Sequence, residues 1–337
     1  MSFPLSVLDL VPLPQGVSAG NAIRNSLELA RLADRLGYRR VWYAEHHNMA
    51  TIASTTPEIM IALAGEATTK IRVGSGGIML PNHSSLKVAE SFKMLEALHP
   101  NRVDLGIGRA PGTDPVTAIA LRGSRQAVVE DNFPTQMADL LHLNEGALPG
   151  NVSAIPAGVP LPNIFLLGSS DYSAHMSAAL GLGFGFAAHF SDFPPEGPML
   201  AYRREFMGDK PHAILTVSAI TADTDEEAER LLSSVLVSFA RLRTGQKPML
   251  LPPEEALVYP FNLREQSVVD AIRDRQIVGT PEKVKATIEE LAHRTKADEV
   301  MVTTMIHSHA ARMRSYELLA GAFGLAGAQQ RELAGAL

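Results

Sequence analysis

The segment VWYAEHHN, residues Val41–Asn48, places a carboxylate and two adjacent histidines directly after an apolar run. Histidine is the side chain whose ordinary pKa lies closest to neutral pH, so Glu45, His46 and His47 are candidates for acid–base chemistry. Two consecutive side chains leave an extended backbone in different directions. One histidine can therefore face a cavity while the other braces a neighbouring loop.

Glycines, serines and an arginine follow three later apolar runs, where they are suited to ligand binding. These candidates are Gly76, Gly77, Gly108, Arg109, Gly168, Ser169 and Ser170, with Tyr172 two positions further on. Free amides at a helix start can hold a phosphate, but serine hydroxyls in the same place also cap the helix. The sequence leaves both interpretations open for Ser169 and Ser170, and it assigns no role to His83 and His189, which also follow apolar runs.

These residues need a scaffold that brings the ends of separate strands together. Eight short apolar runs, from Leu5–Leu10 to Glu299–Thr303, alternate with segments of helical spacing. This alternation of strand and helix patterns predicts an α/β fold, a (β/α)8 TIM barrel with insertions. The loops at the carboxyl ends of its strands would meet at one mouth. A doubly wound sheet is the competing architecture, but VPLPQG after the first run lacks the G-x-G-x-x-G turn typical of that fold.

The whole chain, residues 1–337, is predicted to form one barrel domain, with insertions near 144–162 and 245–275. The prolines and apolar residues of the loops 144–162 and 245–262 favour lids over an apolar pocket, although packing against the barrel would explain them equally well. The spacing also predicts a helix from Val128 to Leu141. A helix around Pro57–Ala67 is rich in small residues and could pack across a two-fold axis or against its own barrel.

Composition narrows the classes of function. The chain has no cysteine, which excludes disulfides and thiolate chemistry and is typical of a reducing cytoplasm. The net charge of −6 is small and no basic block occurs, so a nucleic-acid partner is not expected. No apolar run reaches the length of a membrane span and the first residues lack the features of a secretory signal, so we expect a cytoplasmic protein without a membrane partner.

Eleven histidines raise the alternative of a metal-dependent barrel hydrolase. Such enzymes commonly carry a His-x-His pair after the first strand, where this chain has Asp9-Leu10-Val11-Pro12. Adjacent histidines such as His46 and His47 are poorly placed to share one metal ion. No metal site is therefore predicted.

The motifs together resemble the bacterial luciferase-like flavin monooxygenases, in particular their short, single-subunit branch. The resemblance runs nearly end to end, through AEHHN, IRVGSGGIMLPNHSSLKVAE, RVDLGIGRAPGTDP, LLGSSDYSAHMSAALGLGFGFAAHF and GTPEKVKATIEELAHRTKADEVMV. It implies the same barrel fold, with reduced FMN, or in one branch coenzyme F420, bound at the mouth.

The resemblance also implies roles for single residues. His46 is expected to assist chemistry at the flavin, with Glu45 and His47 beside it. Gly76 and Gly77 are expected to form a cis peptide beneath the flavin ring. The residues expected to contact the ring or the phosphate are Gly108, Arg109, Gly168, Ser169, Ser170 and Tyr172. Light-emitting members carry a cysteine where this chain has Gly108, so luciferase activity in the strict sense is not expected.

The function that the resemblance implies is that of an FMN-dependent monooxygenase acting with O2 on a small organic substrate, and the apolar residues of the two loops favour an apolar one. A homodimer and a separate reductase that supplies the reduced flavin are implied as well. Two alternatives stay open: an F420-dependent enzyme that transfers hydride, and a flavin-binding protein without catalytic activity.

Overall fold

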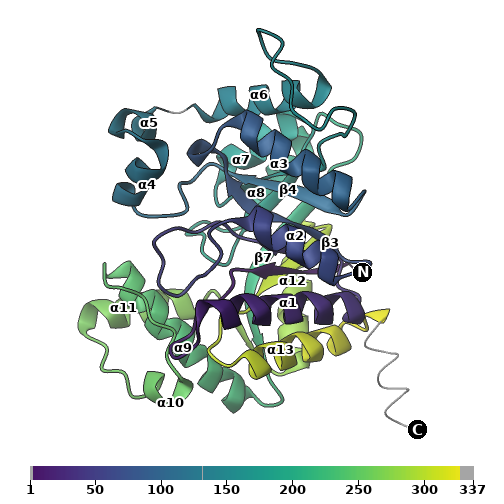
Figure 1. Ribbon diagram of the computed structural model, residues 1–337. Coiled ribbons are helices and arrows are strands. Elements are labelled where there is room, and N and C mark those ends of the chain that lie inside the picture. Colours follow the sequence, from purple (N-terminus) through teal and green to yellow (C-terminus); the bar gives the residue numbers. More distant parts are fainter. Residues whose placement is uncertain (1–2, 131, 327–337) are drawn as a thin grey trace.

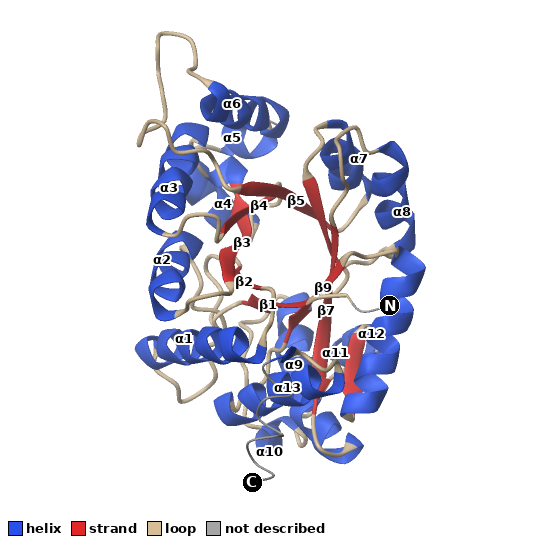
Figure 2. Cartoon of the chain, turned by 90° about the vertical axis from the view of Figure 1, so that its right-hand side faces the viewer, coloured by secondary structure: helices blue, strands red, loops and turns tan. Residues whose placement is uncertain are grey.

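The computed structural model describes residues 3–130 and 132–326 of the 337. Eight parallel strands form its barrel, namely β1 (Leu5–Asp9), β2 (Arg40–Tyr43), β3 (Arg72–Met79), β4 (Val103–Gly108), β5 (Asn163–Gly168), β6 (Gly183–Ala187), β7 (Ala213–Thr221) and β9 (Glu299–Thr303). They pair in the order β6-β5-β4-β3-β2-β1-β9-β7, and pairing of β6 with β7 closes the ring (Figure 2). The predicted TIM barrel is confirmed.

Helices surround the barrel (Figures 1 and 2). The main ones are α1 (Ala19–Leu36), α2 (Pro57–Ala67), α3 (Ser85–Leu98), α6 (Phe133–Glu145), α7 (Asp171–Ala179), α8 (Glu196–Glu205), α12 (Pro281–Thr295) and α13 (His309–Ala322). The ends of α1 follow from local sequence: the Ser18 hydroxyl accepts a hydrogen bond from the Asn21 amide, and Gly37 adopts a left-handed conformation with φ 88°. None of the described helices has the length and apolar character needed to cross a membrane.

The inside of the barrel is filled by an apolar layer. Its buried members are Leu8, Trp42, Ala44, Phe165, Ile214 and Met301. They come from alternating positions on different strands, as expected for side chains that point inward.

A layer of buried charges closes the amino end of the barrel; we call it the ionic floor. Arg40 lies 2.7 Å from both Asp104 and Glu299, and Arg72 lies 2.6 Å from Asp104. His212 contacts Glu299 at 3.1 Å. Because the floor and the apolar layer fill the barrel interior, a ligand that enters the barrel must bind at its carboxyl end, the mouth.

A ninth strand and three helices form an outer lobe that the sequence did not predict as a unit. It consists of α9 (Asp225–Arg243), α10 (Pro253–Ala256), α11 (Leu263–Arg273) and β8 (Gln276–Gly279). β8 pairs with the last part of β7, from Ser218 to Thr221, beyond the part that pairs with β6. The lobe has its own apolar core, which includes Leu232 and Val269. The strand β8, with four residues, is too short to show the alternation of apolar and polar residues that identifies a strand in a sequence.

The helix predicted over Val128–Leu141 is wrong in its first part. The segment after β4 instead forms α4 (Pro115–Arg122) and α5 (Arg125–Val129), and α6 begins only at Phe133. Pro134 lies in the first turn of α6, and a proline inside a continuous helix would remove a backbone hydrogen bond. A helix therefore cannot run straight through this position.

The loop 144–162 is not a lid, contrary to the prediction. It leads from the end of α6 into the first residue of β5, Asn163, so it lies at the amino end of the barrel, opposite the mouth. Loop 245–262 is at the mouth side instead, since the amide of Gln15 in the loop after β1 donates to the Leu250 carbonyl at 3.0 Å. Figure 1 shows α4, α5 and α11 on the same left-hand side of the molecule.

Candidate active site

The residues predicted from the strand ends come together at the mouth. The segment 45–47 directly follows β2, Gly76–Gly77 lies in β3, Gly108–Arg109 ends β4, and 168–170 ends β5. The carboxyl ends of all eight barrel strands face the same opening. Separate pieces of the sequence thus contribute to one site.

The Gly76–Gly77 peptide is cis, as predicted. A Cβ on Gly76 would lie 2.7 Å from Leu8 Cδ1, and one on Gly77 would lie 2.8 Å from the Gly106 carbonyl oxygen. Only glycine fits these two positions without displacing the barrel wall. Gly108 is less restricted, because a Cβ there would lie 2.8 Å from the flexible end of the Met79 side chain, which can move aside.

Glu45 is a buried centre of hydrogen bonds. Its carboxylate lies 2.9 Å from Nε2 of His47 and 2.9 Å from Nε2 of His83, and it accepts from the Met79 amide at 2.9 Å and from Asn82 Nδ2 at 3.3 Å. Its side chain is fully buried. Glu45 therefore joins the loops after β2 and β3 rather than facing the opening of the mouth.

These contacts shift two pKa values. Burial alone would raise the pKa of Glu45, but hydrogen bonds with His83 and His47 and from the Met79 amide outweigh it and leave that pKa below its ordinary value. The hydrogen bond to Glu45 in turn raises the pKa of His83. The pair is a charge-assisted link that favours the ionised carboxylate and the protonated imidazole.

His46 points elsewhere than His47. Its amide donates to the Ser54 carbonyl at 2.9 Å, which fixes the backbone, while its buried Nδ1 has no hydrogen-bond partner among the described residues. Burial lowers the pKa of His46 to about 4. The ring is therefore neutral at neutral pH.

His189 follows β6, and its ring resembles that of His46 in burial and in pKa. Its Nδ1 is buried without a partner among the described residues, and burial lowers its pKa to about 4. The positive charge of a protonated His46 would lower that pKa further. The sequence left His189, His83 and Asn82 without roles; their place directly after strand ends was the only signal available.

Arg109 and Tyr172 meet at the mouth from neighbouring strand ends. The Arg109 guanidinium lies 3.9 Å from the centre of the Tyr172 ring. Ser170 is the N-cap residue of α7 by position, yet its side chain makes no capping hydrogen bond. The first amides of α7 are thus not satisfied by that hydroxyl, which favours the ligand-binding interpretation over the capping one.

A pocket of about 360 Å3 adjoins this helix start. Ser170 and Asp171 line one side, and Phe193, Pro194 and the start of α8 line the other. The Ser191 hydroxyl donates to the Ser169 carbonyl at 2.9 Å and so ties the loop after β6 to the turn after β5. Gly168 is required there, because a Cβ would lie 2.4 Å from Ser173 Oγ.

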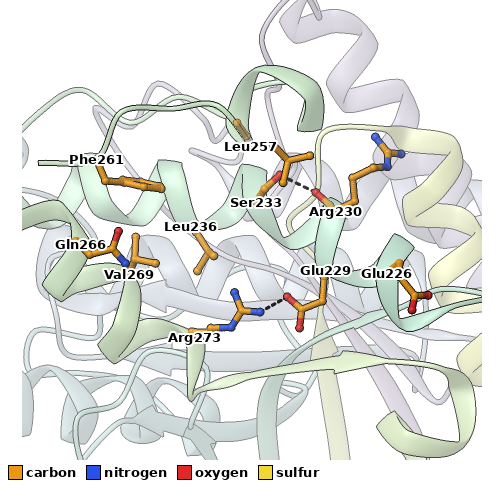
Figure 3. Close-up of a pocket in the computed structure, with 11 residues that line it drawn as sticks. Glu226, Glu229, Arg230, Ser233, Leu236, Leu257, Phe261, Gln266, Val269 and Arg273 are labelled. Atoms are coloured by element: carbon orange, nitrogen blue, oxygen red, sulfur yellow. Dashed lines mark hydrogen bonds and ion pairs between the residues drawn. The ribbon is translucent and has the colours of Figure 1, made fainter.

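A second pocket, of about 570 Å3, lies in the outer lobe and not at the mouth (Figure 3). Its walls come from α9, α10 and α11, with Leu236, Phe261 and Val269 as apolar lining. Arg273 pairs there with Glu229. None of the strand-end residues lines it. Within the described ranges, no three His, Asp or Glu side chains are arranged to hold a metal ion.

Comparison with known proteins identifies the family. The family model described as luciferase-like monooxygenase matches residues 3–299. The chain belongs to the luciferase-like monooxygenase family. The resemblance predicted from the motifs is confirmed, and the chain is a member of an oxidoreductase family.

Two bacterial members are similar to this chain along nearly its whole length. A luciferase-like monooxygenase of Escherichia coli (strain K12) is 41% identical over 319 residues, which cover 93% of this chain and 95% of that protein. The N-acetyl-S-alkylcysteine monooxygenase of Bacillus subtilis (strain 168) is 33% identical over 328 residues, or 94% of this chain and 97% of that protein.

Solved structures agree on the architecture. Apo-MsnO8 has a TM-score of 0.88 at 36% identity, covering 96% of this chain and 98% of that one. Two more distant structures share the fold alone. One is the oxygenating constituent of 3,6-diketocamphane monooxygenase from Pseudomonas putida in complex with FMN (TM-score 0.71, 19% identity, 95% and 97% covered). The other is an F420-dependent secondary alcohol dehydrogenase in complex with an F420-acetone adduct (0.69, 12%, 96% and 99%).

Proposed function

We propose that this chain is an FMN-dependent monooxygenase, which uses reduced FMN and O2 to oxygenate a small, apolar organic substrate. Membership of the luciferase-like monooxygenase family supports the general reaction. The FMN complex of a neighbour with the same fold supports the choice of cofactor. The observation that carries the proposal is the side-chain-free stretch of backbone at Gly76–Gly77, at the same mouth as the His46 Nδ1, which has no hydrogen-bond partner among the described residues.

The residues at the mouth fit a flat cofactor with a phosphate tail. Gly76 and Gly77, close to the end of β3, carry no side chains, which would favour the close approach of a planar ring to the backbone. Arg109, stacked on Tyr172, supplies a positive charge beside the start of α7. The amides that Ser170 does not cap supply hydrogen-bond donors for a phosphate.

Reduced FMN, when bound, supplies the activation of O2. His46 is the residue that we expect to move a proton in the reaction. Its pKa of about 4 makes it a neutral ring and hence a proton acceptor at the start, rather than an acid. Glu45 acts through its partners, since it holds His47 and His83 in place.

The apolar character of the substrate is inferred from side chains around the mouth. Phe193 and Pro194 line the pocket beside the phosphate turn. Phe190 and Phe193 are exposed aromatic side chains on the loop after β6. An apolar substrate would cover these rings, which is favourable at roughly 25 cal/mol per Å2 of apolar surface.

We also propose a homodimer formed through α2 and α3, and reduced flavin delivered by a separate reductase. Four large apolar side chains are exposed on these two neighbouring helices: Ile59 (60%), Leu63 (43%), Met94 (57%) and Leu98 (60%). Each pair is four residues apart, so each forms one stripe on its helix. Exposed apolar stripes on neighbouring helices are typical of a protein–protein interface.

The proposal is tested by anaerobic titration of the purified protein with reduced FMN and, separately, with reduced F420. Each mixture then receives 18O2 together with a panel of short aldehydes, ketones and thioethers. We expect tight binding of reduced FMN and one 18O atom in an organic product. Binding of F420 alone, with hydride transfer and no 18O, would support the F420 alternative. FMN binding without product from any compound would support a non-catalytic flavin protein.

A further inference from the structure

Ser191 joins two walls of the mouth through one buried hydroxyl group. It lies in the loop after β6 and is only 6% exposed. The hydroxyl donates to the carbonyl oxygen of Ser169, directly after the neighbouring strand β5, at 2.9 Å, and it accepts from the Phe193 amide at 3.0 Å. A second acceptor, the Phe193 carbonyl at 3.0 Å, belongs to the same loop as Ser191. The contact with Ser169 is therefore the one that spans two strand ends.

The loop that carries Ser191 is also held by the outer lobe. The guanidinium of Arg275, directly before β8, lies 2.8 Å from the Asp192 carboxylate and donates to the Phe190 carbonyl at 3.4 Å. These two contacts are made by the residues on either side of Ser191 in the chain. A movement of Ser191 away from Ser169 would break them, so the hydroxyl group is kept in place.

The hydrogen bond to the Ser169 carbonyl sets the direction of the next amide in the chain. The peptide between Ser169 and Ser170 is trans, and in a planar trans peptide the C=O and the N–H point in opposite directions. In the barrel, β5 lies between β6 and β4. Since the Ser169 carbonyl faces Ser191 on the β6 side, the Ser170 N–H faces the β4 side. No described residue accepts a hydrogen bond from this amide.

Arg109 directly follows β4, so its charge is on the side that the Ser170 amide faces. Its guanidinium lies 3.9 Å from the centre of the Tyr172 ring, which keeps the charge beside the start of α7. An amide donor, a guanidinium and a helix start all favour an anion. They act together only while the peptide between Ser169 and Ser170 keeps its orientation. If this peptide flipped, its carbonyl oxygen would face Arg109 and would repel a phosphate.

We propose that Ser191 is a positioning residue for the phosphate of the flavin. Its hydroxyl holds the Ser169 carbonyl, and the Ser170 amide is thereby turned to donate to the phosphate beside Arg109. The inference rests on the proposed function, because it takes the mouth as the site of FMN. Riboflavin has the same ring system as FMN but no phosphate, so its affinity should not depend on Ser191.

Anaerobic titrations of the full-length protein with reduced FMN and with reduced riboflavin test this role. We expect Ser191→Ala to bind FMN roughly threefold to tenfold more weakly, as for the loss of one hydrogen bond, and riboflavin with the wild-type Kd. Ser191→Thr keeps a hydroxyl group and should restore the affinity for FMN. Ser233→Ala is the matched control, since Ser233 is similarly buried (8%) and its hydroxyl donates to the Arg230 carbonyl in the outer lobe. Equal weakening of both flavins, or unchanged FMN affinity in Ser191→Ala, would overturn the proposal.

The peptide between Ser169 and Ser170 can also be observed directly, because the chain has three Ser–Ser pairs, at 84–85, 169–170 and 233–234. When the serines carry 13C at the carbonyl carbon and 15N at the amide, an HNCO spectrum shows one peak for each pair. Ser170→Ala identifies the 169–170 peak by removing it. Ser191→Ala should move this peak and leave the 84–85 peak in place, which also shows that the variant is folded. An unmoved 169–170 peak would overturn the proposal.

Inorganic phosphate supplies a test that needs no flavin. It should move the 169–170 peak of the wild type at roughly threefold to tenfold lower concentration than that of Ser191→Ala. This result without binding of reduced FMN by the wild type would contradict the proposed function alone. Equal responses of the two proteins to phosphate would overturn the role of Ser191, even if the wild type binds reduced FMN, so the two failures are distinguishable.

Discussion

The two adjacent histidines after β2 have different tasks because their surroundings differ. His47 is held by the buried carboxylate of Glu45, while the ring of His46 is left without a protein partner among the described residues. Residue types alone suggested that one histidine would face a cavity and the other would brace a loop. Which one does which depends on Glu45, whose contacts with the loop after β3 are not visible in the sequence.

His46→Gln should lower turnover at least roughly tenfold, because general acid–base catalysis contributes about 10²–10⁴-fold. Affinity for reduced FMN should stay within about threefold, since the glycines and Arg109 are unchanged. Steady-state kinetics with saturating flavin, together with a binding titration, would check both values. Unchanged turnover would remove His46 from the mechanism.

Glu45→Gln should lower the pKa of His83, because the hydrogen bond to Glu45 is the main cause that raises it. The raised pKa means that the pair stabilises the fold fully below about 6.5 and loses this contribution as the pH rises through the folded-state pKa. The variant should therefore lose about 1–3 kcal/mol near pH 6, with a smaller loss at pH 9. NMR titration of His83 and urea unfolding at both pH values measure this.

Glu145→Gln serves as the control for Glu45→Gln, because Glu145 is exposed at the end of α6. It should change neither the titration of His83 nor the stability. An unaltered His83 titration in Glu45→Gln would show that Glu45 does not position this histidine.

At the level of elements, the barrel strands could be predicted because each is a short apolar run followed by polar or glycine residues. Gly37 ends α1 through a left-handed conformation, which glycine adopts readily. Two elements, β8 and α4, were not predicted, for physical reasons. β8 is only four residues long, and α4 is a short helix that is recognisable mainly by the residues at its two ends. Asp114 before Pro115 and the left-handed Gly123 are the start and stop signals of α4. They could have been recognised from the sequence.

The composition of a loop does not by itself say which end of the barrel it covers, whereas its place before or after a strand does. Loop 144–162 has the composition of a lid but precedes β5, so it lies away from the mouth. The partners that make the site also join segments far apart in sequence, such as Glu45 with His83 and Ser169 with Ser191. Single-residue patterns cannot specify such pairings.

At the scale of the whole molecule, the ionic floor makes the stability depend on pH. Burial would raise the pKa of Glu299, but hydrogen bonds with His212 and Arg40, together with the charge of Arg40, lower it to about 2. A lowered pKa means stability that is present above about pH 4.5 and is lost as the pH falls towards 2. Glu299→Gln should cost about 3–5 kcal/mol at pH 7, because Arg40 loses a buried partner.

Urea unfolding of the wild type and Glu299→Gln between pH 7 and pH 3 measures this dependence. The difference in free energy of unfolding should shrink below pH 4.5, where the wild-type carboxylate begins to lose its advantage over the unfolded state. A constant difference across this range would show that the floor acts through packing alone.

Association is predicted to depend on the exposed stripes of α2 and α3. Leu63→Glu combined with Leu98→Glu should convert a dimer into a monomer, because two buried charges per subunit would face an apolar partner. Sedimentation velocity detects the change in mass. Val258→Glu is the control, since Val258 is also an apolar residue and is more exposed (79%) but lies in the outer lobe. A dimer that survives the double change would place the interface elsewhere.

The central claim is that separate strand ends form one flavin-binding mouth, and an anaerobic equilibrium titration with reduced FMN tests it most directly. The titration compares the wild type, Arg109→Ala at the mouth and Arg243→Ala at the exposed end of α9. We expect the wild type and Arg243→Ala to bind with the same Kd, and Arg109→Ala to bind at least roughly tenfold more weakly, as expected for loss of a charged contact. Equal affinity in all three proteins, or no binding by the wild type, would contradict the claim.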